Sequence, residues 1–542
     1  MGTLDFARPI CVSSCPVDTA SSFFCASGQT SGYATKDVAG RYCAPTSSAM
    51  VQQMASAMAG GDRLSDVSSK VAELPEVWLA LLVSVVVSLV IGYVFLHGLD
   101  WCAGPMVCLS LGLLVAVPTC VGAYIVWTVK FSGGVEGVPD IMIGNEEQTF
   151  YAGCGLLGLG AILSVMMLCA LGSMEMAIGC IKTATDCMSA MPSMLLVPLF
   201  EVLSKVIVMT AMLAGFALLV SCGDVTSAGG MYKSFSFTTE QYGYLAFYIF
   251  MMLWVCELFT SVSQFVVAHA AQAWYFTPYK NGSKSGAPSC SILTGYLLAG
   301  SAHLGSLLLG AFLIATLRFV RMCLEWVRKR SKESGNSVLA CLASVVGCCV
   351  WCFQKFIEFI NKTAYIEIAI EGTSFCTAAK DAIAVMVKQV GAVSILHGAT
   401  FVLQLGCVGA VAFGGGFATK IMVEYVPPFN DVTSQHYVSD PMFVAGVSAI
   451  IGAIIGVAFM VVFDTVSDTM LFCFAKDTEK AAKEASTSSA STAGRPSPCG
   501  AFLSCGASKK ETGPLKSSEA QKPDHTPEAL KSLLAEHRSG GL

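Results

Sequence analysis

Long apolar blocks recur along this chain, separated by shorter polar connections. The first is Val77–Leu96, which reads VWLALLVSVVVSLVIGYVFL. A hydrocarbon core of roughly 30 Å needs about 20 apolar residues per helix, so a block of this length predicts a membrane-spanning helix. Eight more blocks follow, the seventh of the nine being Cys-rich and the weakest candidate: Cys102–Trp127, Tyr151–Leu171, Met194–Ser221, Tyr242–His269, Ile292–Val320, Val338–Phe359, Ile395–Phe417 and Met442–Phe463.

The composition supports this interpretation. Apolar residues make up 54% of the 542 residues, whereas charged residues make up 13%, about half the usual share of a soluble domain. The net charge of -5 argues against a nucleic-acid partner, and membrane lipids are the expected surroundings. We therefore predict an all-α fold, a polytopic helical membrane protein with about nine transmembrane helices.

Three regions are predicted along the chain. Residues 1–76 form a polar, Cys-containing segment, and residues 77–474 form the transmembrane domain. Residues 475–542 are rich in Lys, Glu and Ser and contain no apolar period. Such a composition is typical of disorder, so the last region is predicted to be a disordered cytosolic tail.

Four cysteines lie in the polar N-terminal segment: Cys11, Cys15, Cys25 and Cys43. Four cysteines in a polar stretch predict two disulfides in an oxidising compartment, so the segment is expected outside the cell. Three connectivities remain open, and free thiols are the alternative. No C-x-x-C is present there, which argues against a zinc site.

An odd number of spans places the N-terminal segment outside and the tail inside. By the same counting, the basic cluster after the sixth block lies outside, against the tendency of basic residues to stay on the cytosolic side. Either the sixth helix extends beyond its apolar block, or one block is a re-entrant or surface helix. The cluster comprises Arg318, Arg321, Arg328, Lys329, Arg330 and Lys332.

Glu257 lies in the middle of the fifth block, where a charge is costly and marks a candidate site. Trp254, Glu257, Ser261 and Gln264 fall within an arc of roughly 80° on one helix face. A ring face beside a carboxylate attracts a quaternary ammonium ion, so these four residues are candidate substrate-binding residues. The alternative is a polar face that pairs with another helix.

Other charges inside the blocks have simpler interpretations. Glu201 and Lys205 stand at i and i+4, a spacing that predicts an ion pair within one helix. Asp464 and Asp468 share this spacing and are expected near the cytosolic end of the last span. The chain contains no H-E-x-x-H, G-x-S-x-G or Walker A motif, so we expect no enzyme activity, cofactor or metal.

Small residues at every fourth position predict where helices touch. One set is Ser448, Gly452 and Gly456 in the last block. The other is Gly406, Ala410 and Gly414 in the block before it.

The stretch CCVWCFQKFIEFINKTAYIEIAIEGTSFCTAAKDAI, residues 348–383, resembles the most distinctive block of the choline transporter-like family. HLGSLLLG, SQFVVAHAAQAWYF and SDTMLFCF resemble further segments of that family, and CVSSCP and RYCAP resemble its extracellular cysteine motifs. The resemblance covers residues 11 to about 479. Within the first stretch, the matching residues are Trp351, Cys352, Lys355, Phe356, Asn361, Ala364, Tyr365, Ile366, Phe375, Cys376, Thr377, Ala379 and Lys380.

The resemblance implies a transporter of choline or a related, ethanolamine-like organic cation, with proton exchange as a proposed coupling and Glu257 as its candidate group. It adds Trp274 and Tyr275, in the matching Trp-Tyr-Phe triplet, to the candidate substrate-binding residues. The family has ten spans, so this chain is expected to begin in the first extracellular loop and to lack the first span. The plasma membrane is the expected location, with an organelle membrane as the alternative.

Two other functions stay open: a non-transporting membrane scaffold or receptor, and a transporter of a different solute. Within residues 353–362, an apolar face and charged residues off it are predicted. The face consists of Phe353, Phe356, Ile357 and Ile360, and the residues off it are Lys355, Glu358 and Lys362. This arrangement is typical of a membrane-surface helix, expected on the cytosolic side. On that side the glycosylation sequons at Asn361 and Asn281 would be unused.

The predicted orientation is tested by membrane-impermeant thiol labelling of intact cells under reducing conditions. Cys11 and Cys43 are expected to react before permeabilisation. Cys499 and Cys505 are expected to react only after the cells are opened. Labelling of either tail cysteine in intact cells would reverse the orientation.

Overall fold

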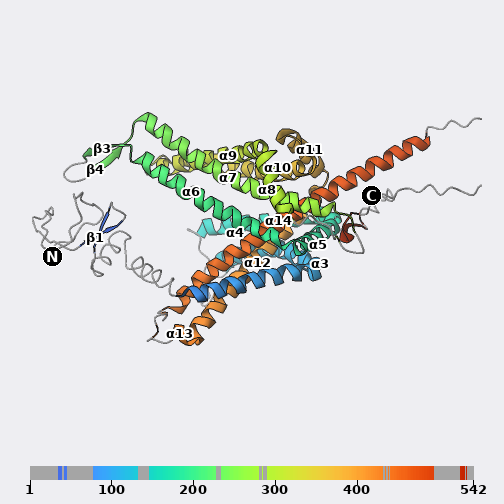
Figure 1. The fold of residues 1–542 in the computed structure, drawn as a ribbon, viewed down its shortest axis with the longest axis horizontal. Coiled ribbons are helices and arrows are strands. Elements are labelled where there is room, and N and C mark those ends of the chain that lie inside the picture. Colours follow the sequence, from blue (N-terminus) through green and yellow to red (C-terminus); the bar gives the residue numbers. More distant parts are fainter. Residues whose placement is uncertain are drawn as a thin grey trace, which may run out of the picture. The chain divides into compact units, whose positions relative to one another are not determined.

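A computed structural model describes residues 35–38, 42–45, 77–131, 146–227, 233–279, 284, 290–430, 434, 438, 440–493, 525–531 and 533. These residues form long helices joined by short connections and two small β-hairpins. The predicted all-α class is therefore confirmed. The helices are α3 (Trp78–Phe131), α4 (Glu146–Ala170), α5 (Met174–Ala190), α6 (Val197–Val220), α7 (Thr239–Tyr275), α8 (Ser291–Ser301), α9 (Leu304–Glu333), α10 (Ser337–Glu371), α11 (Phe375–Val387), α12 (Val390–Tyr425), α13 (Pro427–Asn430) and α14 (Pro441–Ala493) (Figure 1).

Among the described residues, nine helical segments are long and apolar enough to cross a membrane, as the sequence predicts. Two of them, Trp78–Leu99 and Trp101–Lys130, lie within α3. They are separated at Cys102, whose φ of -120° and ψ of 24° interrupt the helix. The seventh, Cys-rich block, the weakest candidate in the sequence, is a span too, since Ser337–Glu371 is one of the nine.

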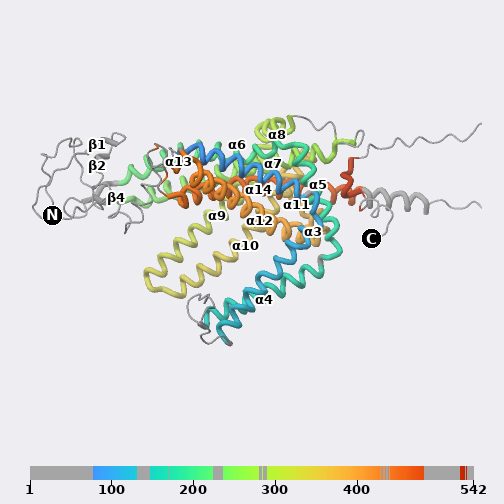
Figure 2. Tube along the Cα trace, turned by 90° about the horizontal axis from the view of Figure 1, so that it is seen from below, coloured from blue at the N-terminus to red at the C-terminus, as the bar shows by residue number. Residues whose placement is uncertain are grey.

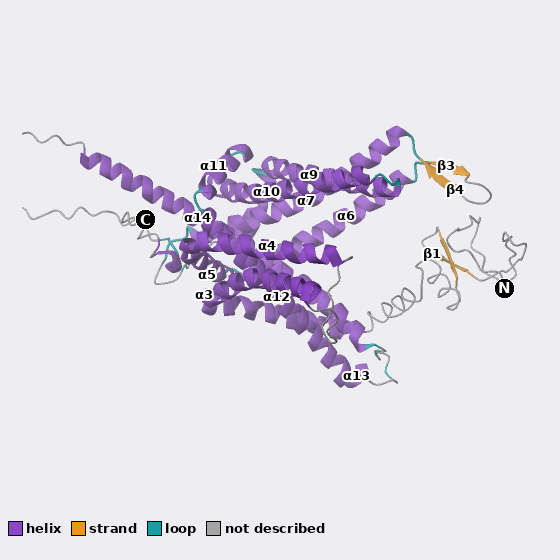
Figure 3. Ribbon diagram, turned by 180° about the vertical axis from the view of Figure 1, so that it is seen from behind, coloured by secondary structure: helices purple, strands orange, loops and turns teal. Residues whose placement is uncertain are grey.

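The two hairpins are antiparallel. In the first, β1 (Thr35–Val38) pairs with β2 (Tyr42–Pro45), and Cys43 stands opposite Asp37. In the second, β3 (Asp224–Ser227) pairs with β4 (Lys233–Ser236) in the connection from α6 to α7 (Figure 3). Cys11, Cys15 and Cys25 lie outside the described residues, so the disulfides stay a prediction.

The chain divides into two compact units. One consists of Met1–Leu89, Leu213–Tyr248 and Val411–Ala453, and the other of Val90–Met212, Ile249–Ala410 and Ile454–Leu542. Within the first unit, apolar side chains at the start of α3 pack against those at the end of α12 and the start of α14. This core includes Val77, Ala80, Val423, Phe429, Val438 and Val444.

The first unit also contains close helix contacts at small residues. A Cβ added at Gly452 would lie 2.8 Å from the carbonyl oxygen of Val411 and 3.1 Å from Ser88 Oγ. One added at Gly415 would lie 2.5 Å from Ser88 Oγ. The close helix contact predicted at Gly452 is confirmed. A Cβ at Gly406 would meet nothing within 4 Å, so the close contact of α12 lies at Gly415 and not at Gly406.

The second unit contains the pair α9 and α10, which lie side by side and antiparallel (Figure 2). Gly335, with a φ of 73°, forms their turn, and Asn336 Oδ1 caps α10 by accepting from the Leu339 N–H at 3.2 Å. The helices share a core with α7, α8 and α11. Its buried members are Phe265, Ala299, Leu307, Ala364, Tyr365, Ile368, Phe375 and Ala378.

The sixth span differs from its predicted range of Ile292–Val320. The chain breaks at Ala302 and His303, so α8 is a separate helix of 11 residues and the span is Leu304–Glu333. The polar residues at the break, Ser301 and His303, interrupt the apolar run only briefly, which is why a pattern about 20 residues long misses it. At the other end, Arg and Lys are good helix formers, so α9 continues through the basic cluster past Val320. This shift places Arg318 in the middle of a span.

The predicted surface helix at residues 353–362 is wrong, because this stretch belongs to the continuous span α10. Phe353 and Phe356 are exposed, while Gln354 and Asn361 are buried. Phe353 and Phe356 thus face outward, as Lys355 does, whereas Gln354 and Asn361 face the protein interior. A helix surrounded by lipid has this polarity, since only the protein can satisfy polar side chains there.

The region after Phe474 also differs from the prediction of an entirely disordered tail. α14 continues to Ala493, because residues 475–493 are rich in the helix formers Ala, Lys and Glu. Farther along, Leu530 is buried, and its side chain would lie 2.7 Å from a Cβ added at Gly179 of α5.

Gly452→Leu is expected to destabilise the fold by about 1–3 kcal/mol, because the added side chain has no room beside Val411. Gly406→Leu is the matched control, since its Cβ position is open. Thermal unfolding of the purified protein measures both. Equal midpoints for the two variants would contradict the close contact at Gly452.

Candidate functional site

Polar side chains of α7, α9 and α10 meet inside the second unit. On α10 they recur at helical spacing, at Gln354, Glu358, Asn361 and Tyr365. Intervals of four, three and four residues place these side chains on one helix face. This face, here called the α10 polar stripe, lies against α7 and α9.

Glu257 of α7 forms an ion pair with Arg318 of α9. The Glu257 side chain is only 4% exposed, whereas the Arg318 side chain is 42% exposed. Arg318 Nη1 contacts Glu257 Oε1, and Nη2 lies 3.6 Å from Oε1 of Glu358 on the stripe. A buried carboxylate at this depth requires a cation, and Arg318 supplies it while reaching a second carboxylate.

The stripe is bound to α9 at a second level. Gln354 Oε1 accepts a hydrogen bond from Arg321 Nη1 at 2.9 Å, and Gln354 Nε2 donates to Glu358 Oε1 at 2.7 Å. Lys355 Nζ lies 2.8 Å from the other oxygen of Glu358. Glu358 is therefore held by three neighbours and stays in place when any one of them moves.

At its other end, the α10 polar stripe makes close contacts with α7 and α9. Tyr365 Oη lies 2.9 Å from Ser261 Oγ of α7. Asn361 Nδ2 donates to the carbonyl oxygen of Gly310 at 2.8 Å, and a Cβ at Gly310 would clash with Tyr365 Oη. Position 310 therefore requires glycine. Since Asn361 is buried, its sequon is not available for a glycan.

The structure brings most of the predicted α7 face into this interface. The Trp254 indole N–H donates to the carbonyl oxygen of Leu308 at 3.0 Å, and its ring packs edge-on against Phe312. Glu257 and Ser261 contact α9 and α10 as described above, while Gln264 is half-buried. Trp254, Glu257 and Ser261 of this face thus all pair with neighbouring helices.

Trp274 and Tyr275 lie elsewhere. Trp274 is 17 residues beyond Glu257 on the same helix, about 26 Å along its axis. The ammonium of Lys284 lies 4.4 Å from the Trp274 ring centroid and donates to the carbonyl oxygens of Trp274, Tyr275 and His525. The predicted substrate-binding residues therefore occupy two separate places, and a lysine of the chain occupies the second.

A second buried ionic cluster joins α10 to α14. Lys362 Nζ lies 2.5 Å from Asp464 Oδ2 and 2.7 Å from Asp468 Oδ2. The ring nitrogens of His397 lie 3.9 and 3.7 Å from the same two carboxylates. His397, Asp464 and Asp468 are metal-ligand types within reach of one another, but the Lys362 ammonium already supplies a positive charge between the carboxylates.

Three further ion pairs neutralise charges on the helices. Lys476 of α14 lies 2.8 Å from both Glu367 and Glu371 at the end of α10. The predicted pair of Glu201 and Lys205 is confirmed, with 2.5 Å between Oε1 and Nζ.

Sequence reasoning missed Arg318, because the sixth span was placed too early. It also missed the α10 polar stripe, although the four-three-four spacing is visible in the sequence. That spacing inside an apolar block is the signal that marks such a face.

Residues 154–479 match the protein family described as plasma-membrane choline transporter. Choline transporter-like protein 5 of Xenopus tropicalis is 30% identical over 234 residues, which cover 43% of this chain and 32% of that protein. Choline transporter-like protein 2 of Homo sapiens is 33% identical over 198 residues, which cover 35% of this chain and 27% of that protein.

A third relative, choline transporter-like protein 2 of Danio rerio, is 30% identical over 239 residues, or 44% of this chain and 33% of that protein. The chain thus spans about a third or less of the length of these curated relatives. The matched family segment includes α7, α9 and α10 and the first part of α14.

Lys362→Met is expected to destabilise the protein by about 3–5 kcal/mol, because it leaves the buried Asp468 beside the partly exposed Asp464 without the lysine cation. Lys388→Met is the matched control. Lys388 is 60% exposed and pairs with Glu479, so its loss is expected to cost about 0–1 kcal/mol. Thermal unfolding of the two purified variants makes the comparison, and equal losses would contradict the buried role of Lys362.

Proposed function

Because this chain belongs to the plasma-membrane choline transporter family and is a multi-pass membrane protein, we propose that it moves choline or a related organic cation across the membrane. An ethanolamine-like ammonium is the related substrate. The observation that carries this proposal is Glu257, a carboxylate buried at the middle of α7 whose partner is the side chain of Arg318 on another helix.

The geometry around Glu257 suits exchange of one cation for another. Arg318 is 42% exposed and already reaches Glu358, so it can leave Glu257 without losing its second carboxylate. An organic cation then takes its place beside Glu257. The number of buried charges that lack a partner does not rise in this step, which keeps the desolvation cost low.

Trp254 stands one turn before Glu257 on the same helix face. Its ring face is a suitable wall for a quaternary ammonium, because the negative face of an indole attracts a cation without any hydrogen bond. A carboxylate and an aromatic ring on one face thus favour an organic cation over an anion.

The transport step is alternating access around this midplane site. We propose proton exchange as the coupling, with Glu257 as the group that changes its charge. Protonation of Glu257 removes the negative charge that holds the organic cation and leaves Arg318 to pair with Glu358. Release of the cation and uptake of a proton are then one event.

Two other functions make different predictions. In a non-transporting scaffold or receptor, the pair of Glu257 and Arg318 only stabilises the fold. In a transporter of another solute, uptake occurs but choline does not compete for it. Measuring uptake per molecule at the cell surface separates these functions from choline transport.

Glu257→Gln is expected to lower choline uptake at least about tenfold, a loss of roughly 1.4 kcal/mol or more, because it removes the charge and keeps the shape. Uptake of labelled choline, normalised to surface protein, is the measurement. Glu333→Gln is the control, since Glu333 is exposed and pairs with Arg330 at the end of α9. Wild-type uptake by Glu257→Gln at normal surface level would remove Glu257 from the mechanism.

Glu358→Gln tests the exchange. Without the second carboxylate, Arg318 pairs with Glu257 alone and competes more strongly with the organic cation. The choline concentration for half-maximal uptake is expected to rise about fivefold, which equals about 1 kcal/mol. An unchanged value at normal surface level would show that Arg318 does not move to Glu358 during transport.

A further inference from the structure

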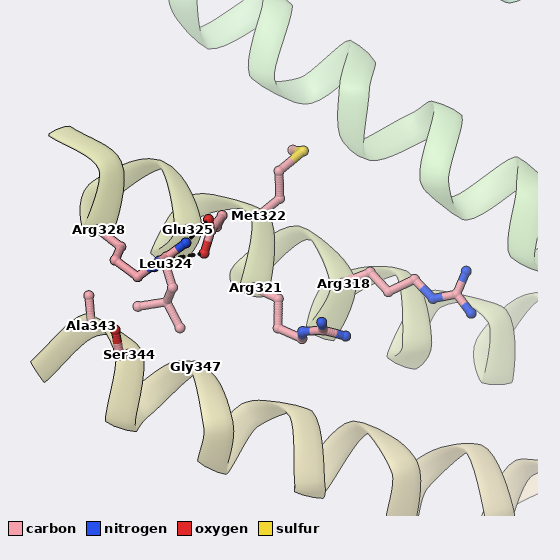
Figure 4. A pocket seen from close by; sticks show the side chains of 9 residues that line it. All are labelled: Arg318, Arg321, Met322, Leu324, Glu325, Arg328, Ala343, Ser344 and Gly347. Atoms are coloured by element: carbon pink, nitrogen blue, oxygen red, sulfur yellow. Dashed lines mark hydrogen bonds and ion pairs between the residues drawn. The ribbon is translucent and has the colours of Figure 1, made fainter. Parts of the chain in front are cut away.

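A cavity of about 630 Å³ lies between α9 and α10, near the turn that joins them. Figure 4 shows long side chains of α9 on one side and the backbone of α10 on the other. Its size is within the usual range of small-molecule sites, about 300–1,000 Å³. The lining residues are Arg318, Arg321, Met322, Leu324, Glu325, Arg328, Ala343, Ser344 and Gly347.

Small residues of α10 leave room for this cavity. Ala343, Ser344 and Gly347 stand within one turn of α10, opposite the arginines of α9. A Cβ added at Gly347 would meet no atom within 4 Å. Position 347 therefore opens onto empty space, and a larger side chain there would occupy part of the cavity without a backbone clash.

The charge of the lining is unbalanced. Arg328 donates to both carboxylate oxygens of Glu325, and Arg318 contacts Glu257 and Glu358. Arg321 differs, because its partner is the neutral amide oxygen of Gln354. Among the residues that the structure describes, Arg321 is thus the lining arginine that no carboxylate neutralises.

An uncompensated guanidinium next to a membrane is costly unless an anion joins it. Guanidinium is planar and binds a phosphate through two parallel N–H donors, which makes phosphate a well-matched partner. Arg321 uses one terminal nitrogen for Gln354, and its remaining N–H groups are available to such a ligand.

The surroundings add an apolar requirement. Met322 and Trp326 of α9 are 40% and 67% exposed, and Leu342 and Val346 of α10 are 57% and 39% exposed. These side chains are on the same two helices and within one or two turns of the cavity lining. A ligand with a phosphate and long apolar chains satisfies both Arg321 and these exposed side chains.

We infer that this cavity binds the phosphate group of a membrane phospholipid, with Arg321 as its main contact and the acyl chains along Met322, Trp326, Leu342 and Val346. The site lies beyond the proposed transport function, because none of its ligand contacts requires choline or Glu257. Arg318 forms the border between the two sites.

Native mass spectrometry of the full purified chain with added phosphatidylglycerol tests the inference. The dissociation constant is expected to rise at least tenfold in Arg321→Gln and in Gly347→Leu, and less in Arg321→Lys. Arg330→Gln and Gly406→Leu are the matched controls. Arg330 is on the same helix, is 72% exposed and pairs with Glu333, and Gly406 is an open position on α12.

Two further probes identify the group that is recognised. Diacylglycerol lacks the phosphate, and inorganic phosphate lacks the chains. Weak binding of both, with tight binding of phosphatidylglycerol, supports the lipid site. Equal binding of diacylglycerol, displacement of the lipid by inorganic phosphate at the same concentration, or unchanged binding by correctly folded Arg321→Gln would each overturn it.

Discussion

A charge inside the hydrocarbon core must find its partner within the protein, and this constraint governs how α7, α9, α10 and α14 pack. Water is absent at that depth, and an unpaired ion is strongly disfavoured. Glu257 with Arg318, and Lys362 with Asp464 and Asp468, each join two helices that are distant in the sequence. The ion pairs therefore set which helix faces meet.

The same constraint reverses the polarity of α10. Phe353 and Phe356 point outward, while Gln354 and Asn361 are buried against α9. Gly310 completes the arrangement, since only a residue without a side chain leaves room for Tyr365. Close approach at Gly310 and hydrogen bonding by the α10 polar stripe are thus two parts of one contact.

The two proposals concern arginines of α9 that differ in their partners. Arg318 is half-exposed between two carboxylates, and the proposed mechanism has a substrate cation replace its contact with Glu257. Arg321, one turn farther along α9, has only an amide partner and faces a cavity. α9 therefore carries the arginines of both proposals: Arg318, which a substrate cation would displace, and Arg321, which a phosphate would neutralise.

From the sequence alone follow the all-α class, the nine spans found among the described residues and the pair of Glu201 and Lys205, because hydropathy and i, i+4 spacing are local properties. The sequence did not locate the break before α9, because the polar interruption at Ser301 and His303 is short compared with a span of about 20 residues. The partners of Glu257 and Lys362 lie 61 and about 100 residues away, and no local pattern pairs them. Only the tertiary structure decided those pairings, because they depend on which helix faces come together in three dimensions.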